Sequence, residues 1–171
     1  SLMNKKLSLK SMVLFALLLA LKIILSRLTG ISFGIVKLSF GFIATALTGY
    51  LFGPYLSALA GILSDLLGFM LFPQGSYFIG FTLSSMLSGL LFGLFLHKKR
   101  MTILRLLSVS ALEFLLCSLF LNTLWTSLLY GKSFLALLPI RLIKNVILLP
   151  IQTLILWGLF KYLKEHLKVP H

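Results

Sequence analysis

Acidic residues are scarce in this sequence, and charged residues of either sign are few. Only 3 of the 171 residues are Asp or Glu, and charged residues make up 11% of the chain, less than half of the ~25% that is usual in soluble domains. The chain has no pair of carboxylates spaced for acid–base catalysis, no HExxH zinc motif and no His in the interior of an apolar run. These absences argue against an enzyme, so we expect no catalytic residues.

Cysteine is almost absent as well. The single Cys117 cannot form a disulfide within one chain. The stretch Tyr130–Ser133 imitates the end of a phosphate-binding loop, but Thr126 stands where that loop requires its first Gly. We therefore expect no metal, no cofactor and no nucleotide site in this chain.

Apolar residues take the place of the missing charged residues. The hydrophobic fraction is 59%, against about 45–50% in soluble proteins, and the mean hydropathy is +1.07. Several nearly charge-free windows reach 18 residues, and a transmembrane helix needs ~20. The sequence therefore predicts an all-α integral membrane protein. Ser1 and Leu2 precede Met3 and are typical of residues added by cloning, and the first apolar run is predicted to be an uncleaved span rather than a signal peptide.

The apolar runs divide into six predicted transmembrane helices within a single membrane domain, residues 1–171. Gly53-Pro54, the turn Pro73–Tyr77 and the basic turn His97–Arg100 separate several of them. The approximate ranges of the six helices are 9–28, 38–52, 55–72, 78–97, 102–130 and 133–163.

The net charge of +13 indicates an orientation in the membrane rather than nucleic acid binding. Most Lys and Arg residues lie in the N-terminal segment, in the connection around Lys98–Arg105 and in the C-terminal segment. Cytoplasmic loops retain the excess of cations, and six spans put these three segments on one face. We therefore expect both termini to be cytoplasmic.

Small residues recur at every fourth position in three of the predicted helices. Such stripes let helix backbones approach each other closely in lipid, so we expect these helices to pack within the bundle. The stripes are Gly41, Thr45, Gly49 and Gly53 in the second helix, Ser57, Gly61 and Asp65 in the third, and Ser85, Gly89 and Gly93 in the fourth.

Several polar side chains lie at helical depth within the apolar runs. A charge at the bilayer centre costs about 2.5–3.5 kcal/mol on insertion scales, so it needs a partner or a water-filled cavity. At a rise of ~1.5 Å per residue, these side chains fall in one layer roughly 8–15 Å below the outer surface. They are Asp65 in the third helix, Asn122 and Trp125 in the fifth, and Arg141, Lys144 and Asn145 on one face of the sixth. This convergence predicts a cavity that opens to the outside and suits an anionic, aromatic ligand.

Other interpretations of the intramembrane charges stay open. Asp65 could pair with a cation of the sixth helix as a structural ion pair, although two cations against one acid leave positive charge in surplus. Glu113 lies nearer the middle of the membrane and could absorb that surplus. Lys22 is expected to extend outward to the membrane surface. Lys37, at the outer start of the second helix, could do the same or attract an anion.

Four stretches of the chain resemble a known family. "FALLLALKIIL" has Ala16 and Ala20 on one face, and it looks like the AxxxA element of the substrate-binding (S) subunits of energy-coupling factor (ECF) vitamin transporters. Residues Gly49–Phe95 resemble the second to fourth spans of the same family. "LNTLWTSLLYG" together with "LPIRLIKN" resembles its folate-specific branch, although Thr126 stands where that branch has Leu.

This resemblance implies a six-helix S subunit that captures folate from outside, in a bacterial cell membrane. Such a subunit would dock on a membrane-embedded coupling subunit driven by two cytoplasmic ATPases, which would use the ATP. By the same resemblance, Ala16 and Ala20 would meet the coupling subunit.

Folate also suits the polar layer predicted from the residues. Cations neutralise its two carboxylates, a carboxylate or amide accepts hydrogen bonds from its pterin, and aromatic side chains stack on its rings. The predicted substrate-binding residues are Lys37, Asp65, Tyr77, Asn122, Trp125, Arg141, Lys144 and Asn145.

Alternatives to folate binding also remain at this level. The ligand could be another vitamin, since pantothenate is anionic and riboflavin and thiamine are aromatic. A small oligomeric secondary transporter is a different class, but the chain shows no clear inverted repeat. A structural or assembly protein would not need polar groups that converge in one layer.

Overall fold

The computed structural model describes residues 9–27, 30–33, 36–73 and 77–167, and for residues 27, 30–33, 36–39, 166 and 167 it describes the backbone alone. Ser1 and Leu2 lie outside the described residues. The helices are α1 (Leu9–Arg27), α2 (Gly41–Phe52), α3 (Pro54–Leu71), α4 (Ile79–Leu96), α5 (Ile103–Glu113), a π-helix η1 (Phe114–Leu121), α6 (Asn122–Tyr130) and α7 (Phe134–Leu167).

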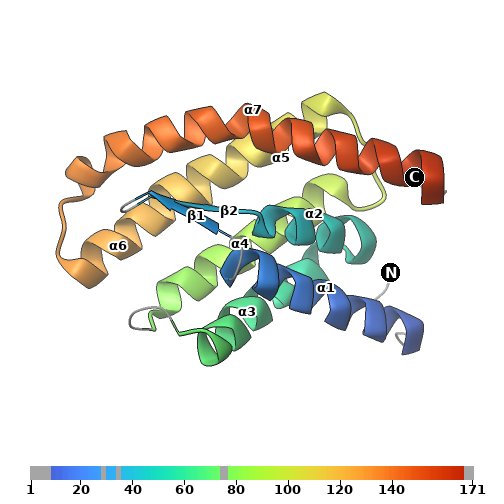
Figure 1. The fold of residues 1–171 in the computed structure, drawn as a ribbon, viewed down its shortest axis with the longest axis horizontal. Helices are drawn as coiled ribbons and strands as arrows, with labels where there is room; N and C mark the ends of the chain where they lie inside the picture. The colour runs from blue at the N-terminus through green and yellow to red at the C-terminus, as the bar shows by residue number, and fades with distance from the viewer. Residues whose placement is uncertain (1–8, 28–29, 34–35, 74–76, 168–171) are drawn as a thin grey trace.

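These helices agree with the predicted apolar runs. By length and composition, five segments are able to cross a membrane: α1, α3, α4, the continuous α5–η1–α6 and α7. The sixth, α2, is equally apolar but has only 12 residues. The prediction of a helical, multi-pass architecture is confirmed at this level, while the number of spans stays a prediction. Figure 1 shows α5 and α6 in one line beside α7, with α1, α2, α3 and α4 grouped below them.

A short β-hairpin between α1 and α2 was not predicted. Strands β1 (Gly30–Phe33) and β2 (Val36–Ser39) pair antiparallel, with Gly30 opposite Ser39 and Ile31 opposite Leu38. Apolar residues alternate with small or polar ones in this stretch, a period that suits strands rather than helices. The second helix consequently begins at Gly41, a few residues later than expected, and β2 contacts α7.

Glycines set the close packing of α2, α3 and α4. A Cβ added at Gly89 would overlap the backbone of Ser57 in α3, and one added at Gly61 would overlap the backbone of Ser85 in α4. At Gly49, an added Cβ would lie 2.7 Å from the backbone nitrogen of Gly93. The predicted small-residue stripes therefore pack inside the bundle, because only a hydrogen in place of Cβ lets these backbones meet.

We expect Gly89→Ala to destabilise the protein, because neither helix backbone can give way to the added methyl group. Overpacking of this kind costs typically about 1–3 kcal/mol. Gly158→Ala is the matched control, since a Cβ there would meet nothing within 4 Å. Thermal unfolding in detergent should show a midpoint lower by several degrees for Gly89→Ala and little change for Gly158→Ala. Equal midpoints would show that this contact is not tight.

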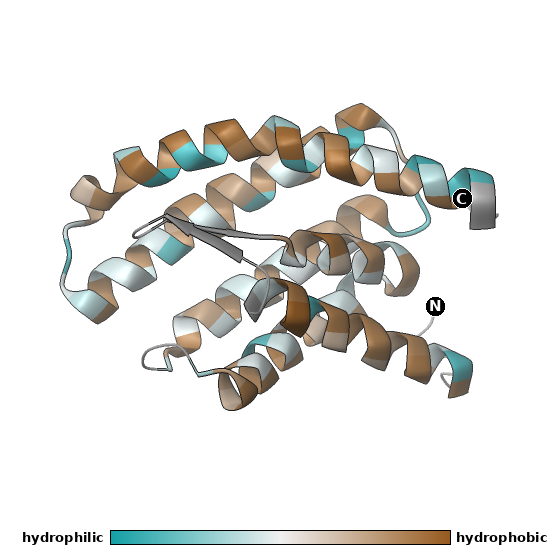
Figure 2. Cartoon of the chain, viewed as in Figure 1, coloured by the Kyte–Doolittle hydropathy of each residue, from teal (hydrophilic) through white to brown (hydrophobic). Residues whose placement is uncertain are grey.

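The outer surface of the bundle is apolar, as a lipid-facing surface requires. Figure 2 shows hydrophobic residues along the outside of α1 and α7. Leu17 and Leu135 are among the most exposed large side chains, at 62% and 75%. The buried core lies between α4, α5 and α7, where Phe92, Leu106 and Leu156 are fully enclosed. Polar side chains gather in a different place, inside the bundle.

Candidate binding cavity

One cavity of about 470 Å³ lies among the helices, and residues of α1, α2, α3, α4, α5–η1–α6 and α7 all contribute to its wall. This volume lies within the range of ~300–1,000 Å³ that is usual for small-molecule sites. Its charged lining residues are Lys22, Asp65, Glu113 and Lys144. Serines of α4 line one side of it, and Phe42, Phe81 and Phe114 supply aromatic surface.

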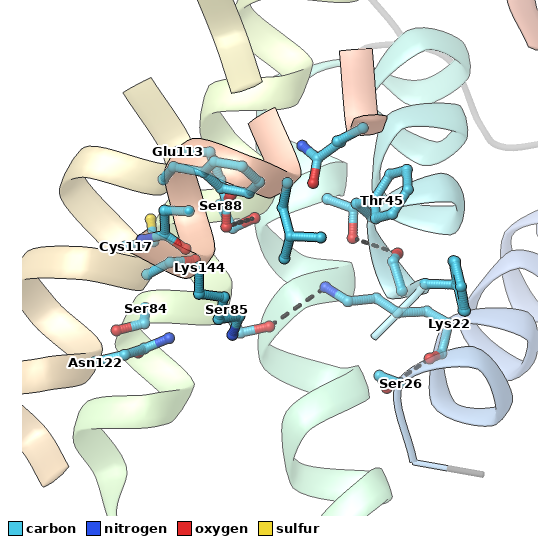
Figure 3. Close-up of a pocket in the computed structure, with 18 of the residues that line it drawn as sticks. Lys22, Ser26, Thr45, Ser84, Ser85, Ser88, Glu113, Cys117, Asn122 and Lys144 are labelled. Atoms are coloured by element: carbon cyan, nitrogen blue, oxygen red, sulfur yellow. Dashed lines mark hydrogen bonds between the residues drawn. The ribbon is translucent and has the colours of Figure 1, made fainter. Parts of the chain in front are cut away.

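Lys22 lies in the cavity, so the prediction that it extends outward was wrong. Its Nζ donates to Ser85 Oγ across 3.3 Å, and Figure 3 shows the side chain pointing from α1 toward α4. Leu18, which lies one turn earlier on the same face, is buried, and Ser26, one turn later, also lines the cavity. The face of α1 that carries Lys22 is thus turned into the bundle rather than toward lipid.

Glu113 is the second charge that sequence reasoning did not assign to the site. It ends α5 and lines the cavity, and Ser88 Oγ donates to its Oε1 at 3.4 Å. Among the described residues, no ion pair joins Glu113 to Lys22 or Lys144. The cavity therefore holds cationic and anionic groups that are spaced apart and able to meet a ligand of mixed charge.

The π-helix η1 determines how the fifth span faces this cavity. A π-helix has wider turns than an α-helix, and such segments are frequent at functional sites. Here the segment follows Glu113 and precedes Asn122, and both residues line the cavity together with Cys117 and Ser118. The change in helical period thus places polar groups from three successive turns on one face.

Two buried amide atoms in the cavity wall have no hydrogen-bond partner among the described residues. They are Oδ1 of Asn122, an acceptor, and Nδ2 of Asn145, a donor, and they come from α6 and α7. Leaving a buried polar atom unsatisfied costs about 1–3 kcal/mol. A ligand that presents a neighbouring donor and acceptor would satisfy both atoms.

Asp65 takes part in a chain of hydroxyl groups at the edge of the cavity. Thr82 Oγ1 donates to Asp65 Oδ2 at 2.5 Å, and the Tyr77 hydroxyl lies 2.9 Å from the same Thr82 oxygen. Because the Thr82 proton goes to the carboxylate, the Tyr77 hydroxyl is the donor in the second bond. Tyr77 also packs against Phe69, with ring centroids 5.4 Å apart.

Trp125 and Arg141 support the cavity wall and are not among its lining residues. Trp125 Nε1 donates to Ser84 Oγ at 2.9 Å, and its ring lies edge-on to Phe78 with centroids 5.7 Å apart. Arg141 Nη2 donates to Thr126 Oγ1 at 3.2 Å. Both side chains thus hold neighbouring polar groups in place.

Comparison with known proteins identifies the family. Residues 10–160 match the family described as ECF transporter, substrate-specific component. The chain belongs to this family. The family is one of transporter components, and this agrees with the expectation that the chain is not an enzyme.

Individual relatives of this substrate-specific component carry more specific names. The chain is 37% identical over 150 residues to a protein of Clostridium novyi (strain NT) named folate transporter FolT. This match covers 88% of this chain and 87% of that protein. The chain is 35% identical over 153 residues to a protein of the same name from Leuconostoc mesenteroides, covering 86% and 82%. Among solved structures, a crystal structure of FolT bound with folic acid superposes with a TM-score of 0.84 at 37% identity, covering 89% of this chain and 93% of that one.

Four of the eight residues predicted for this substrate-specific component line the cavity: Asp65, Asn122, Lys144 and Asn145. Tyr77, Trp125 and Arg141 lie beside it, bonded to Thr82, Ser84 and Thr126. The backbone of Lys37 lies in β2, and its side chain is outside the described part of the structure. Lys22 and Glu113 were missed, although both carried a usable signal as charges inside apolar runs, which default to a functional role.

Proposed function

We propose that this substrate-specific component binds folate from outside the cell and delivers it through an ECF-type coupling complex. The observation that carries the proposal is the cavity. Its two lysines, its two carboxylates and the two amide atoms that have no hydrogen-bond partner among the described residues match the mixed chemistry of folate. The likeness to FolT bound with folic acid supports the same ligand. Folate combines a donor-rich pterin, an aromatic linker and a glutamate with two carboxylates.

Each part of folate has complementary groups in the cavity. Lys22 and Lys144 neutralise the glutamate carboxylates through charge-assisted hydrogen bonds. Glu113 accepts from the amino and ring N–H groups of the pterin. Asn122 and Asn145 add an acceptor and a donor for amide-like edges of the ligand. Within this arrangement Asp65 lines the cavity and accepts a hydrogen bond from Thr82.

A direct test measures folate binding by the purified chain. Calorimetry without ATP should show one folate per protein, because the cavity lies in this chain, and pantothenate or riboflavin should not compete. Mass spectrometry of the protein as purified should find the same compound. Binding of a different vitamin with folate excluded would overturn the choice of ligand.

The proposed topology places both termini and the α4–α5 turn in the cytoplasm of a bacterial cell. The turn carries Lys98, Lys99 and Arg100, all exposed, whereas the α6–α7 turn carries the exposed Lys132. The cation bias supports this orientation. A membrane-impermeant amine label applied to intact cells should modify Lys132 and leave Lys98 and Lys99 unmodified. Labelling with the opposite pattern would reverse the topology and move the folate entrance to the other side.

The proposed partners are a membrane-embedded coupling subunit and two ATPases, and α1 is the proposed contact. Ala16 and Ala20 are both exposed on the outer face of α1, one turn apart. Small residues on such a face let a partner helix approach closely.

We expect Ala16→Trp and Ala20→Trp to reduce folate uptake by the whole complex at least tenfold, because a bulky side chain on this face blocks docking. Folate binding by the isolated chain should be unchanged. Leu17→Trp, at a position that is already bulky and 62% exposed, is the matched control. Equal loss of uptake and of binding would place the alanines in packing within the bundle instead.

A further inference from the structure

A second, smaller pocket lies at the end of the bundle that carries the α4–α5 turn and the C-terminal part of α7 (Figure 1). Its volume is about 30 Å³, and three cations and three apolar side chains surround it. The cations are Lys99, Arg100 and Lys164, the apolar side chains are Met101, Phe160 and Leu163, and Tyr50 completes the lining. This pocket shares no lining residue with the large cavity.

Two distant parts of the chain bring the three cations together. Lys98 adopts φ 55°, which ends α4 and turns the chain back, and Lys99 N donates to Leu96 O at 3.3 Å. Lys164 approaches from α7, which is held in place by its buried Phe160, whose ring packs on Tyr50 with centroids 5.1 Å apart. The cluster is therefore built by the tertiary fold and is more specific than a basic stretch of sequence.

The positive charges of this cluster surround one small pocket. Within the part of the chain that the structure describes, none of Lys99, Arg100 and Lys164 forms an ion pair. Like charges around one pocket repel each other, so an anion placed there is stabilised by all three. Arg100 offers a planar fork of donors and the lysines offer point charges, a combination that suits the oxygens of a phosphate group.

The size and surroundings of the pocket indicate what carries the phosphate. A volume of 30 Å³ is far below the ~300–1,000 Å³ that is usual for small-molecule sites, so the pocket cannot enclose a nucleotide or another whole metabolite. Large apolar side chains close in sequence to the lining residues Met101 and Leu163 are exposed, with Ile103 48% exposed, Leu104 69% and Tyr162 57%. The bulk of the ligand must therefore lie outside the pocket, against an apolar surface.

We propose that this pocket binds the phosphate of an anionic phospholipid, whose acyl chains lie along the apolar surfaces of α5 and α7. Basic pockets between transmembrane helices near the membrane surface are suited to such headgroups. The bound phosphate joins the α4–α5 turn to the end of α7 and neutralises the cluster. Lipid binding here needs no folate, so this proposal stands apart from the proposed function.

The test is a lipid titration of the full chain in a neutral detergent, followed by native mass spectrometry. The probes are phosphatidylglycerol, phosphatidylcholine and inorganic phosphate as a competitor. The pocket variant is Lys99→Gln, Arg100→Gln and Lys164→Gln combined. The matched control is Lys10→Gln, Lys98→Asn and Lys161→Gln combined, which removes the same charge from residues that do not line the pocket, and Asn tolerates the left-handed conformation of Lys98.

We expect one phosphatidylglycerol to bind at least about tenfold more tightly than phosphatidylcholine, and the pocket variant to lose this preference while the control keeps it. Equal loss in both triple variants would show a diffuse charge effect and overturn the site. Displacement of the lipid by an equal concentration of inorganic phosphate would assign the pocket to free phosphate instead. If the pocket variant does not fold, Arg100→Gln against Lys98→Asn makes the same comparison, and equal affinities for the lipid would reject the proposal.

Discussion

Replacing Lys144 with Gln should weaken folate binding by about tenfold to a hundredfold. A hydrogen bond to a charged group contributes about 1.5–3 kcal/mol, and ~1.4 kcal/mol corresponds to a factor of ten in affinity. The Lys144 side chain lines the cavity and is only partly exposed, so its attraction to a carboxylate is screened less than it would be at an open surface. Isothermal titration calorimetry of the purified chain measures the change.

Arg141→Gln is the matched control for Lys144→Gln. It removes the same charge from the same helix, but the guanidinium bonds to Thr126 and does not line the cavity. We expect its effect to stay within about threefold, the range of substitutions away from a contact. If Arg141→Gln reduces the affinity for folate more than Lys144→Gln does, Arg141 rather than Lys144 binds the folate carboxylates, which the sequence alone also allowed.

A truncated ligand sharpens the assignment of Lys144. A pterin that lacks the glutamate has already lost the carboxylates, so Lys144→Gln should then change its affinity little. The two losses are expected to be strongly non-additive, which is the signature of a direct contact. If Lys144→Gln weakens the binding of folate and of the truncated pterin equally, Lys144 does not bind the carboxylates.

Glu113→Gln should weaken the binding of folate by a similar factor of about ten to a hundred, and a similar loss of affinity is expected for the truncated pterin. The substitution keeps the shape but removes the charge and one acceptor, and it adds an NH₂ group that opposes the donors of the pterin. The same charge-assisted bond strength sets the magnitude. Competition with radiolabelled folate measures both ligands in one assay.

Asp65→Asn is the comparison that decides between the two carboxylates of the cavity. Asp65 already accepts from Thr82, so its replacement is expected to have the smaller effect of the two. A persistent loss for Asp65→Asn together with a small one for Glu113→Gln would assign the pterin to Asp65. Ser88→Ala adds a further control, since it removes the 3.4 Å bond to Glu113 and leaves the carboxylate in place.

The sequence by itself determined most of the helical segments. An apolar run long enough to cross lipid has few alternatives to a helix, because its backbone must bond to itself there. A depth can then be predicted by counting residues, and three of the side chains predicted to share one layer, Asp65, Asn122 and Lys144, line one cavity. The small-residue stripes likewise predicted the close helix contacts that are seen at Gly61 and Gly89.

Only the tertiary structure decided which way each helix turns its side chains about its own axis. Counting residues does not show which face of a helix is turned into the bundle, because both faces of a helix in lipid are apolar. A single charged residue on such a helix does not distinguish the two faces. Lys22 therefore looked like a residue facing the membrane surface and proved to line the cavity, while Arg141 lies beside it. Glu113 and Asn122 line the same cavity because the wider turns of η1 lie between them, and a change of helical period within one apolar run was not evident from the sequence.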